Sequence, residues 1–426
     1  MNKFPKDFLL GASTAAHQVE GNNIYSDYWA MEQLEHSNFD EPSLDAVDHY
    51  HRYEEDILLM EKVGLNAYRF SIEWARIEPV QGKYDANEIA HYRKVLECCH
   101  KHGITPIVTM HHFSSPKWLI TRGGWEWDGI ESVFPAYCRY VVENLGDLME
   151  YVCTINEANM GLQIASVAMS MMKSMGIAPQ VGMNFEEMIE SYMPESRKQQ
   201  KKEMETAFET KEAIHDFLSM RTENGDNIMI RAHSAARRAM KECCPHLKVG
   251  MTFSLYDIQV KEGGEELAHK EWEEHFGHYS KVLQDDDFIG VQNYSRKIIG
   301  PQGDMGIPEG AEVTQMDYEY YPQGIAHVVR RVAEELPGKE LIITENGIAT
   351  LDDSRRQEFI KTALTELEAC VVDGIPLKGY LHWSLMDNFE WQKGYSKNFG
   401  LIAVDRTTQV RAPKESLFLL GNFRRG

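Results

Sequence analysis

The stretch Leu341-Ile-Ile-Thr-Glu-Asn-Gly347 predicts a buried strand that ends in a carboxylate. Its leucine, isoleucines and threonine favour an extended chain, and Asn346-Gly347 tolerates the positive φ of a tight turn. Glu345 is therefore expected at the carboxyl end of a strand, where parallel α/β proteins place their reactive groups. A glutamate there acts as nucleophile, general base or metal ligand, or it merely caps the next helix or pairs with an arginine.

The rest of the chain alternates strand-like and helix-like segments. Apolar runs predict strands at 8–15, 65–72, 104–110, 151–156, 247–253, 288–292, 340–344 and 378–383. Helical spacing occurs at 48–63, 87–102, 130–149, 228–241, 270–283, 324–336 and 354–372. Eight strands in alternation with helices predict a single α/β domain over residues 1–426, folded as a closed (β/α)8 TIM barrel.

Glycines mark the ends of several predicted helices. Gly64, Gly103 and Gly374 each follow a helical segment and precede an apolar run. Glycine supplies the left-handed position just past a helix end, so the recurrence is typical of repeated βα units. Asp48 is the expected cap at the start of the first long helix.

The acidic composition limits the function classes. Lys and Arg total 44 against 66 Asp and Glu, a net charge of −22, so nucleic acids and anionic membrane surfaces should be repelled. No apolar stretch approaches the ~20 residues of a membrane span, and the run at 8–13 is too short for a signal peptide. The seven cysteines include the adjacent pairs Cys98-Cys99 and Cys243-Cys244, which is typical of reduced thiols. We therefore expect a cytoplasmic protein.

Residues 158–227, after the fourth predicted strand, exceed what one crossover helix needs. We expect an extended loop and helical insertion there. Its part at Glu195–Glu212 is highly charged and predicts a solvated helix. Seven methionines lie between Met160 and Met188, and such flexible side chains either fill a core or line an adaptable apolar pocket.

Polar side chains follow several other predicted strands. They are Arg69, His111-His112, Asn156-Glu157, Gln292 with Tyr294, and Trp383 before Glu390-Trp391. In a closed barrel these strand ends meet at one mouth, where Glu157 faces Glu345. Two glutamates together with aromatic platforms and amide or imidazole groups are the equipment for cleaving a sugar acetal.

Metal or nucleotide chemistry has less support in the sequence. His111 and His112 are neighbours on a strand, so they should point to opposite faces and not grip one ion. No Cys or His spacing resembles a zinc site, and there is no Gly-x-Gly-x-x-Gly or Walker-type loop. We expect no metal and no cofactor.

Five motifs in order cover nearly the whole chain. They are Phe8-Leu-Leu-Gly-Ala-Ser-Thr-Ala-Ala-His-Gln-Val-Glu-Gly21, Tyr68-Arg-Phe-Ser-Ile-Glu-Trp-Ala-Arg-Ile77, Thr154-Ile-Asn-Glu157, Ile343-Thr-Glu-Asn-Gly347 and Gly379-Tyr-Leu-His-Trp-Ser-Leu-Met-Asp-Asn-Phe-Glu-Trp391. Together they resemble glycoside hydrolase family one, the β-glucosidases and their relatives. The resemblance implies a (β/α)8 barrel that cleaves a small β-glycoside by a retaining mechanism without a cofactor.

The resemblance also implies a role for each matching residue. Glu157 matches the acid/base and Glu345 the nucleophile, with Arg69 and Tyr294 as partners of the nucleophile. The positions that match contacts to the sugar's hydroxyls are Gln18, His112, Asn156, Glu390 and Trp391, and Trp383 matches the stacking platform. Arg69 should favour the carboxylate of Glu345, while Glu157, facing that negative charge, should hold its proton longer.

The chain departs from the family pattern at several of these places. Ala158 stands where the family usually has proline, Phe113-Ser114 replaces Trp-Asp after the sugar-binding histidine, and Gln292 replaces an asparagine among the sugar-binding positions. These changes remove no reacting group. They leave open the natural aglycone and the choice among glucose, galactose and fucose.

Three alternatives use the same framework. A 6-phospho-β-glucosidase would need a phosphate site, and Lys397 falls close to where such relatives place a lysine. Those relatives tend to carry Ser in place of Glu390 and Tyr in place of Phe399, so we favour an unphosphorylated sugar. A transglycosidase would employ the same residues as a hydrolase. A non-catalytic sugar-binding barrel would have no need of both Glu157 and Glu345. The oligomeric state is not predicted.

Overall fold

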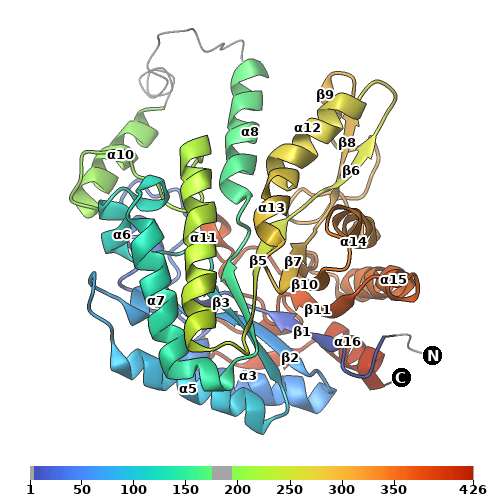
Figure 1. The fold of residues 1–426 in the computed structure, drawn as a ribbon, viewed down its shortest axis with the longest axis horizontal. Coiled ribbons are helices and arrows are strands. Elements are labelled where there is room, and N and C mark those ends of the chain that lie inside the picture. The colour runs from blue at the N-terminus through green and yellow to red at the C-terminus, as the bar shows by residue number, and fades with distance from the viewer. Residues whose placement is uncertain (1–3, 175–193, 426) are drawn as a thin grey trace.

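A closed barrel of eight parallel strands forms the centre of the computed structural model, which describes residues 4–174 and 194–425 (Figure 1). In chain order its strands are β1 (Leu9–Ser13), β2 (Ala67–Ser71), β3 (Thr105–His111), β4 (Tyr151–Ile155), β5 (Lys248–Ser254), β7 (Phe288–Gln292), β10 (Glu340–Asn346) and β11 (Leu377–Trp383). Each strand pairs with the next, and β11 closes the barrel on β1. The predicted (β/α)8 fold and all eight of its strands are confirmed.

Helices cover the outside of the barrel in the expected alternation (Figure 1). The principal ones are α3 (His49–Val63), α5 (Ala86–Lys101), α7 (Ile130–Leu145), α11 (Glu223–Cys243), α12 (Glu265–His275), α14 (Gly324–Glu335), α15 (Asp353–Val372) and the C-terminal α16 (Glu415–Arg425). Short helices occupy the loops: α1 (Ala16–Val19), α2 (Asp27–Glu32), α4 (Trp74–Ile77), α6 (Lys117–Thr121) and α13 (Ser280–Leu283). Small sheets β6–β8–β9 (Asp257–Val260, Arg296–Gly300, Gly303–Asp304) and β12–β13 (Ile402–Val404, Arg411–Pro413) complete the fold.

The glycine helix stops are present as predicted. Gly64, Gly103 and Gly374 have φ values of +94°, +66° and +88°, the left-handed conformation that glycine adopts without strain. Asp48 does precede α3, but its side chain makes no capping bond. Its carboxylate instead accepts hydrogen bonds from His51 and Arg52, so the predicted position of the N-cap is confirmed, while the side-chain hydrogen bond typical of such caps is not made.

The helix expected at 270–283 is broken. Helix α12 ends at His275, a single turn follows at Gly277–Tyr279, and α13 starts at Ser280. Phe276 leaves the helical conformation with a φ of −150° and packs its buried ring against Phe253, with ring centroids 5.2 Å apart. Burial of this aromatic side chain against β5 overrides the helical spacing.

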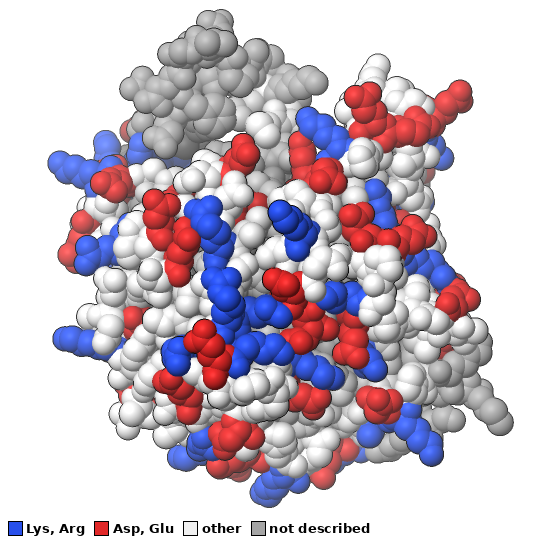
Figure 2. Space-filling view, viewed as in Figure 1, with Lys and Arg blue, Asp and Glu red and all other residues white. Residues whose placement is uncertain are grey.

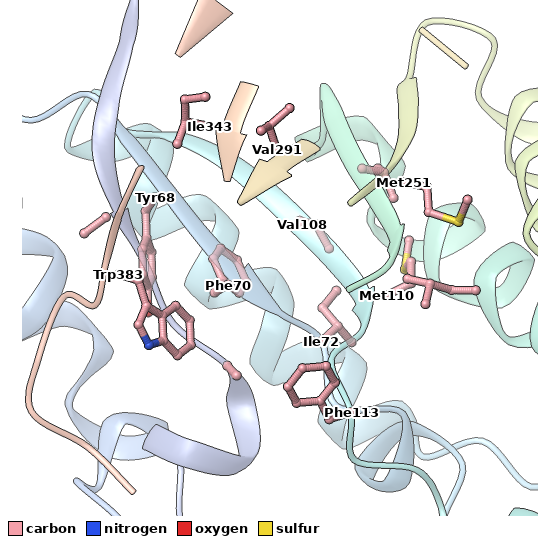
Figure 3. Packing of buried hydrophobic residues seen from close by; sticks show 14 of the residues in the cluster. Tyr68, Phe70, Ile72, Val108, Met110, Phe113, Met251, Val291, Ile343 and Trp383 are labelled. Atoms are coloured by element: carbon pink, nitrogen blue, oxygen red, sulfur yellow. The ribbon is translucent and has the colours of Figure 1, made fainter. Parts of the chain in front are cut away.

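Two apolar clusters lie on opposite faces of the strands. The larger joins the barrel to its helices and includes Val291 and Ile343, which face each other on the neighbouring strands β7 and β10 (Figure 3). The smaller comprises Leu9, Ala67, Ile107, Tyr151, Cys153, Phe288, Ile342 and Leu381, and every barrel strand except β5 contributes to it. Because successive residues of a strand point to opposite faces, this second cluster fills the barrel interior below the mouth.

The insertion begins with α8 (Met160–Ser174), which rises from the barrel beside α11 and α12 (Figure 1). Residues 175–193 lie outside the described residues, and three of the seven methionines fall among them. Of the others, Met169 and Met171 are exposed. Helix α10 (Glu195–Ala207) is mostly exposed as expected, but it ends five residues before Glu212 and is followed by the fully buried Phe208.

Charges of both signs are interspersed on the face in Figure 2. Ion pairs such as Lys241–Asp287, 2.7 Å, join neighbouring side chains of opposite charge. In the described part of the chain, no helix combines the length and apolar character that crossing a membrane requires.

Candidate active site

A cavity of about 320 Å³ opens at the carboxyl ends of the barrel strands. Seven of the predicted site residues line it: His112, Glu157, Tyr294, Glu345, Trp383, Glu390 and Trp391. The other four are not among the lining residues; Arg69, Gln18 and Asn156 bond to residues that line the cavity, and Gln292 bonds to Asn156. The strand-end reasoning therefore located side chains that the fold brings to one mouth.

Glu345 is held by two donors. The Nη1 of Arg69 donates to Oε1 over 2.6 Å, and the hydroxyl of Tyr294 donates to Oε2 over 2.5 Å. A local irregularity in β10 between Ile343 and Glu345 sets Glu345 opposite Gln292 of β7, and such irregularities re-aim side chains beside active sites. Both carboxyl oxygens of Glu345 thus have fixed partners, and only 2% of the residue is exposed.

Asn156 links several of these groups. Its Oδ1 accepts hydrogen bonds from Arg69, 2.5 Å, and from the amide of Gln292, 2.8 Å. Its Nδ2 lies 3.1 Å from Nε2 of His112, a cavity-lining residue. Gln292 was expected among the sugar contacts. Its amide instead donates to Asn156 and, over 3.2 Å, to Thr252 Oγ1. The longer glutamine thus reaches a neighbouring side chain rather than the cavity.

Glu157 follows β4 in a left-handed backbone conformation with a φ of +46°. Its backbone N–H donates to the hydroxyl oxygen of Thr252 over 3.0 Å. The methyl group of Thr252 requires a glycine opposite, because a Cβ at Gly290 would lie 2.4 Å from it. A non-glycine residue at positive φ is uncommon and clusters at functional sites.

Burial raises the pKa of both glutamates, but not equally. The pKa of Glu157 lies well above its ordinary value. Burial is the largest cause of the rise, and the negative charge of Glu345 adds to it. For Glu345 burial also raises the pKa, while Arg69 and Tyr294 oppose the rise. Arg69 does favour the carboxylate of Glu345, as expected. Burial has the larger effect, however, so the pKa of Glu345 is raised overall. Glu157 therefore keeps its proton more firmly than Glu345.

The far wall of the cavity carries the expected sugar-binding groups. Gln18 donates to the backbone oxygen of Phe389 at 2.7 Å and to Glu390 Oε2 at 3.3 Å, which fixes that carboxyl group. Burial, then the charge of Glu345, raises the pKa of Glu390 to about 8. The ring of His112 stacks at 5.7 Å from Trp383 and 6.1 Å from Trp391.

His111 and His112 point to opposite sides of β3, as predicted. His112 lines the cavity, whereas Nε2 of His111 pairs with Ser115 Oγ at 2.9 Å. Among the described residues, one group could hold a metal ion, namely Glu35, His36 and Glu203, and none of the three lines this cavity.

Several cavity residues were missed by sequence reasoning. They are Gln163, Ser254, Leu255, Tyr256, Met316, Tyr318, Gln392 and Lys393. Met160, one of the methionines expected either to fill a core or to line a pocket, does line the cavity, and so does Phe399. Tyr256 follows β5, so a search for polar side chains just after that strand would have found it. Met316 and Tyr318 lie in the long loop before α14 and follow no barrel strand, so such a search gives no signal for them. The departure Phe113 also lines the cavity, beside Trp391 at 5.2 Å.

Two buried carboxyl groups with different proton affinities, set in an aromatic cavity, can supply one acid and one nucleophile. A barrel with this equipment at its mouth defines a carbohydrate-cleaving class of enzyme. The comparisons with known proteins agree, since residues 1–424 match the family model described as glycosyl hydrolase family 1.

Curated and solved relatives cover the chain almost completely. A 1,4-β-D-glucan glucohydrolase of Thermotoga neapolitana is 31% identical over 99% of this chain and 98% of its own. A 6-phospho-β-galactosidase of Lacticaseibacillus casei is 27% identical over 97% and 96%. A crystal structure of a β-glycosidase has a TM-score of 0.88 at 43% identity, covering 100% of this chain and 97% of that one. This protein belongs to glycosyl hydrolase family 1 and is a glycoside hydrolase.

Proposed function

We propose that this enzyme hydrolyses the terminal, non-reducing β-D-glucosyl residue of unphosphorylated β-glycosides by double displacement, with retention of configuration. The observation that carries the proposal is the unequal environment of the two carboxyl groups. Glu345 receives hydrogen bonds from Arg69 and Tyr294, which favour its ionised form, whereas Glu157 faces its negative charge. One acid and one nucleophile are the pair that a retaining glycosidase needs.

In the first step, Glu345 attacks the anomeric carbon and forms a glycosyl-enzyme ester, while Glu157 gives its proton to the departing oxygen. The aglycone leaves as a neutral alcohol. In the second step, Glu157, now ionised, takes a proton from water, and the oxygen of that water displaces Glu345. Both carboxyl groups then return to their starting forms.

The cavity wall orients the sugar for this attack. Trp383 offers a flat face for the sugar ring, and His112, Trp391 and Glu390 present polar groups to its hydroxyls. Because its pKa is raised to about 8, Glu390 can either donate or accept a hydrogen bond near neutral pH. Gln18 and Asn156 hold two of these contacts in place from behind.

Substitution of the two glutamates separates their roles. Glu157→Ala should lose far more activity on a phenyl β-glucoside than on 2,4-dinitrophenyl β-glucoside, because only the poor leaving group needs a proton in the first step. Glu345→Ala should be nearly inactive on both. Equal losses on the two substrates for Glu157→Ala would exclude its role as the acid.

A 6-phospho-β-glycosidase is the second candidate, and the Lacticaseibacillus casei relative favours it. Lys393 lines the cavity, and Lys397 is close enough to lower the pKa of Glu390. Against it, the ammonium of Lys397 donates to the backbone oxygen of Gln315 at 2.7 Å, and Phe399 offers no hydroxyl. In favour of the phosphorylated sugar, the raised pKa of Glu390 weakens the charge repulsion between a phosphate and that carboxyl group.

The test compares kcat/KM for p-nitrophenyl β-glucoside with that for its 6-phosphate. We expect the unphosphorylated substrate to be preferred. Preference for the phosphate would reverse the assignment and make Lys397 a ligand.

We further propose that residues 1–426 form one catalytic domain that acts in the cytoplasm. Seven free cysteines, five of them buried, suit a reducing compartment. Mass spectrometry of the freshly isolated protein under thiol labelling should find all seven reduced; a disulfide would contradict the proposal.

A further inference from the structure

The turn after β4, which carries Glu157, is fixed at both of its peptide groups. The N–H of Glu157 donates to Thr252 Oγ1, and the N–H of Ala158 donates to the backbone oxygen of Thr252, each over 3.0 Å. Proline at position 158 could not make the second bond, because it has no N–H. Alanine therefore ties the residue after Glu157 to strand β5.

The charged side chain of Arg221 holds the backbone carbonyl of Ala158. Nη1 of Arg221 donates to the backbone oxygen of Ala158 over 2.5 Å. Arg221 lies in the inserted segment, two residues before α11 begins, and only 2% of its side chain is exposed. A hydrogen bond from a buried guanidinium to a carbonyl is charge-assisted, so it is stronger and more directional than a neutral one.

Arg221 is itself held in one place. Its Nη2 donates to the backbone oxygen of Phe217 at 3.3 Å, and its guanidinium lies 4.6 Å from the centre of the Phe217 ring. Asp226 lies 3.8 Å from Nη1 and accepts a 2.6 Å hydrogen bond from the hydroxyl of Tyr279. The arginine is therefore anchored by a ring, a carbonyl and a carboxylate.

The first turn of α8 is shaped to admit this side chain. A Cβ at Gly161 would come within 2.8 Å of the Arg221 Cβ and 2.9 Å of its Nε. The backbone N–H of Arg221 also donates to the carbonyl of Gly161 at 3.2 Å. The segment before α11 thus packs directly on the turn that carries Glu157.

We propose that Arg221 is a positioning residue for proton transfer: by holding the carbonyl of Ala158, it fixes the left-handed backbone of Glu157 and aims that carboxyl group at the departing oxygen. The inference rests on the proposed acid/base role of Glu157. Arg221 acts through the backbone, because burial is the first cause of the raised pKa of Glu157, and the charges that follow it are those of Glu345, Arg69 and Glu390. The inserted segment thereby takes part in catalysis without touching the sugar.

The test measures kcat/KM of Arg221→Met on phenyl β-glucoside and on 2,4-dinitrophenyl β-glucoside. A misaimed acid harms only the substrate that needs a proton, so we expect a loss of about 10- to 100-fold on the phenyl glycoside and under about 3-fold on the dinitrophenyl glycoside. Arg411→Met is the matched control. It removes another buried arginine, whose partners are Asp56 and Val47, and it should leave the ratio of the two activities unchanged.

A double variant shows whether Arg221 works through Glu157. In the Glu157→Ala background, Arg221→Met should cause no further selective loss on the phenyl glycoside. Equal losses on both substrates for Arg221→Met, or a selective loss that persists in that background, would overturn the inference. If Arg221→Met does not fold, Arg221→Gln is read in the same way, because the shorter neutral amide keeps a polar group there but removes the charged donor to the Ala158 carbonyl.

Failure of the proposed function gives a different pattern. If Glu157→Ala alone loses activity equally on both substrates, the acid role of Glu157 is refuted, and the inference falls with it. If Glu157→Ala shows the selective loss and Arg221→Met does not, only the inference is refuted.

Discussion

Replacing Tyr294 by phenylalanine should shift the pH below which the enzyme loses activity. In the native site, the Tyr294 hydroxyl donates to Glu345 Oε2 over 2.5 Å, and Arg69 donates to the other oxygen. The hydroxyl stabilises the carboxylate and opposes the rise that burial causes in the pKa of Glu345. Tyr294→Phe removes one donor and leaves the cavity wall in place.

The magnitude follows from the bond that is lost. A hydrogen bond to a charged group contributes about 1.5–3 kcal/mol, and 1.36 kcal/mol corresponds to a factor of ten in proton affinity, so the pKa of Glu345 should rise by about 1–2. The nucleophile must be ionised in the free enzyme. The acidic limb of the kcat/KM profile should therefore move to higher pH by about 1–2.

The assay is the pH profile of kcat/KM on 2,4-dinitrophenyl β-glucoside, whose leaving group needs no acid. Tyr318→Phe, which removes a hydroxyl from the same cavity wall, is the control, and its acidic limb should stay in place. An acidic limb of Tyr294→Phe that stays where it is in the wild type, or moves to lower pH, would refute the role assigned to this hydrogen bond.

Two further predictions concern stability and geometry. Arg411→Met should lower the free energy of unfolding by about 3–5 kcal/mol, measured by denaturant titration, because it removes the arginine that pairs with the buried Asp56 and leaves only His49 beside that carboxylate. Although burial alone would raise it, hydrogen bonds from His49 and Arg411 hold the pKa of Asp56 below its ordinary value. The ionised Asp56 therefore contributes its full stabilisation above about pH 4 and loses it as the pH falls through the native pKa. The difference in unfolding free energy between wild type and variant should shrink in acid. A difference that is constant or grows there would contradict this account. In a crystal structure the carboxyl groups of Glu157 and Glu345 should lie about 5–5.5 Å apart, whereas about 6.5–9.5 Å would indicate inversion.

The barrel was predictable because each of its units carries a local signal. Leu341–Ile343 and the other apolar runs favour strands, and Gly64, Gly103 and Gly374 end helices by a conformation that other residues rarely adopt. The break at Phe276 had no such signal. It depends on the packing of one aromatic ring against Phe253, a contact between segments that sequence spacing does not reveal.

The site was predictable only as far as strand ends and motifs reach. Glu157, Glu345 and Trp383 lie at or just beyond the carboxyl ends of barrel strands, so topology alone brings them to one mouth. Arg221 meets Ala158 across 63 residues of inserted chain, where neither periodicity nor topology predicts proximity. The net rise in the pKa of Glu345 was also missed, because the cost of burial depends on how completely the folded chain excludes water.

The central claim is that Glu345 attacks the sugar directly and that water then displaces Glu345 from the opposite face, which is the face the aglycone left. Proton NMR during the first minutes of hydrolysis of an aryl β-glucoside tests this, because it identifies the anomer released before mutarotation mixes the two forms. Double displacement predicts that β-glucose appears first and α-glucose later. The initial appearance of α-glucose would show single displacement by water and would contradict the roles assigned to both glutamates.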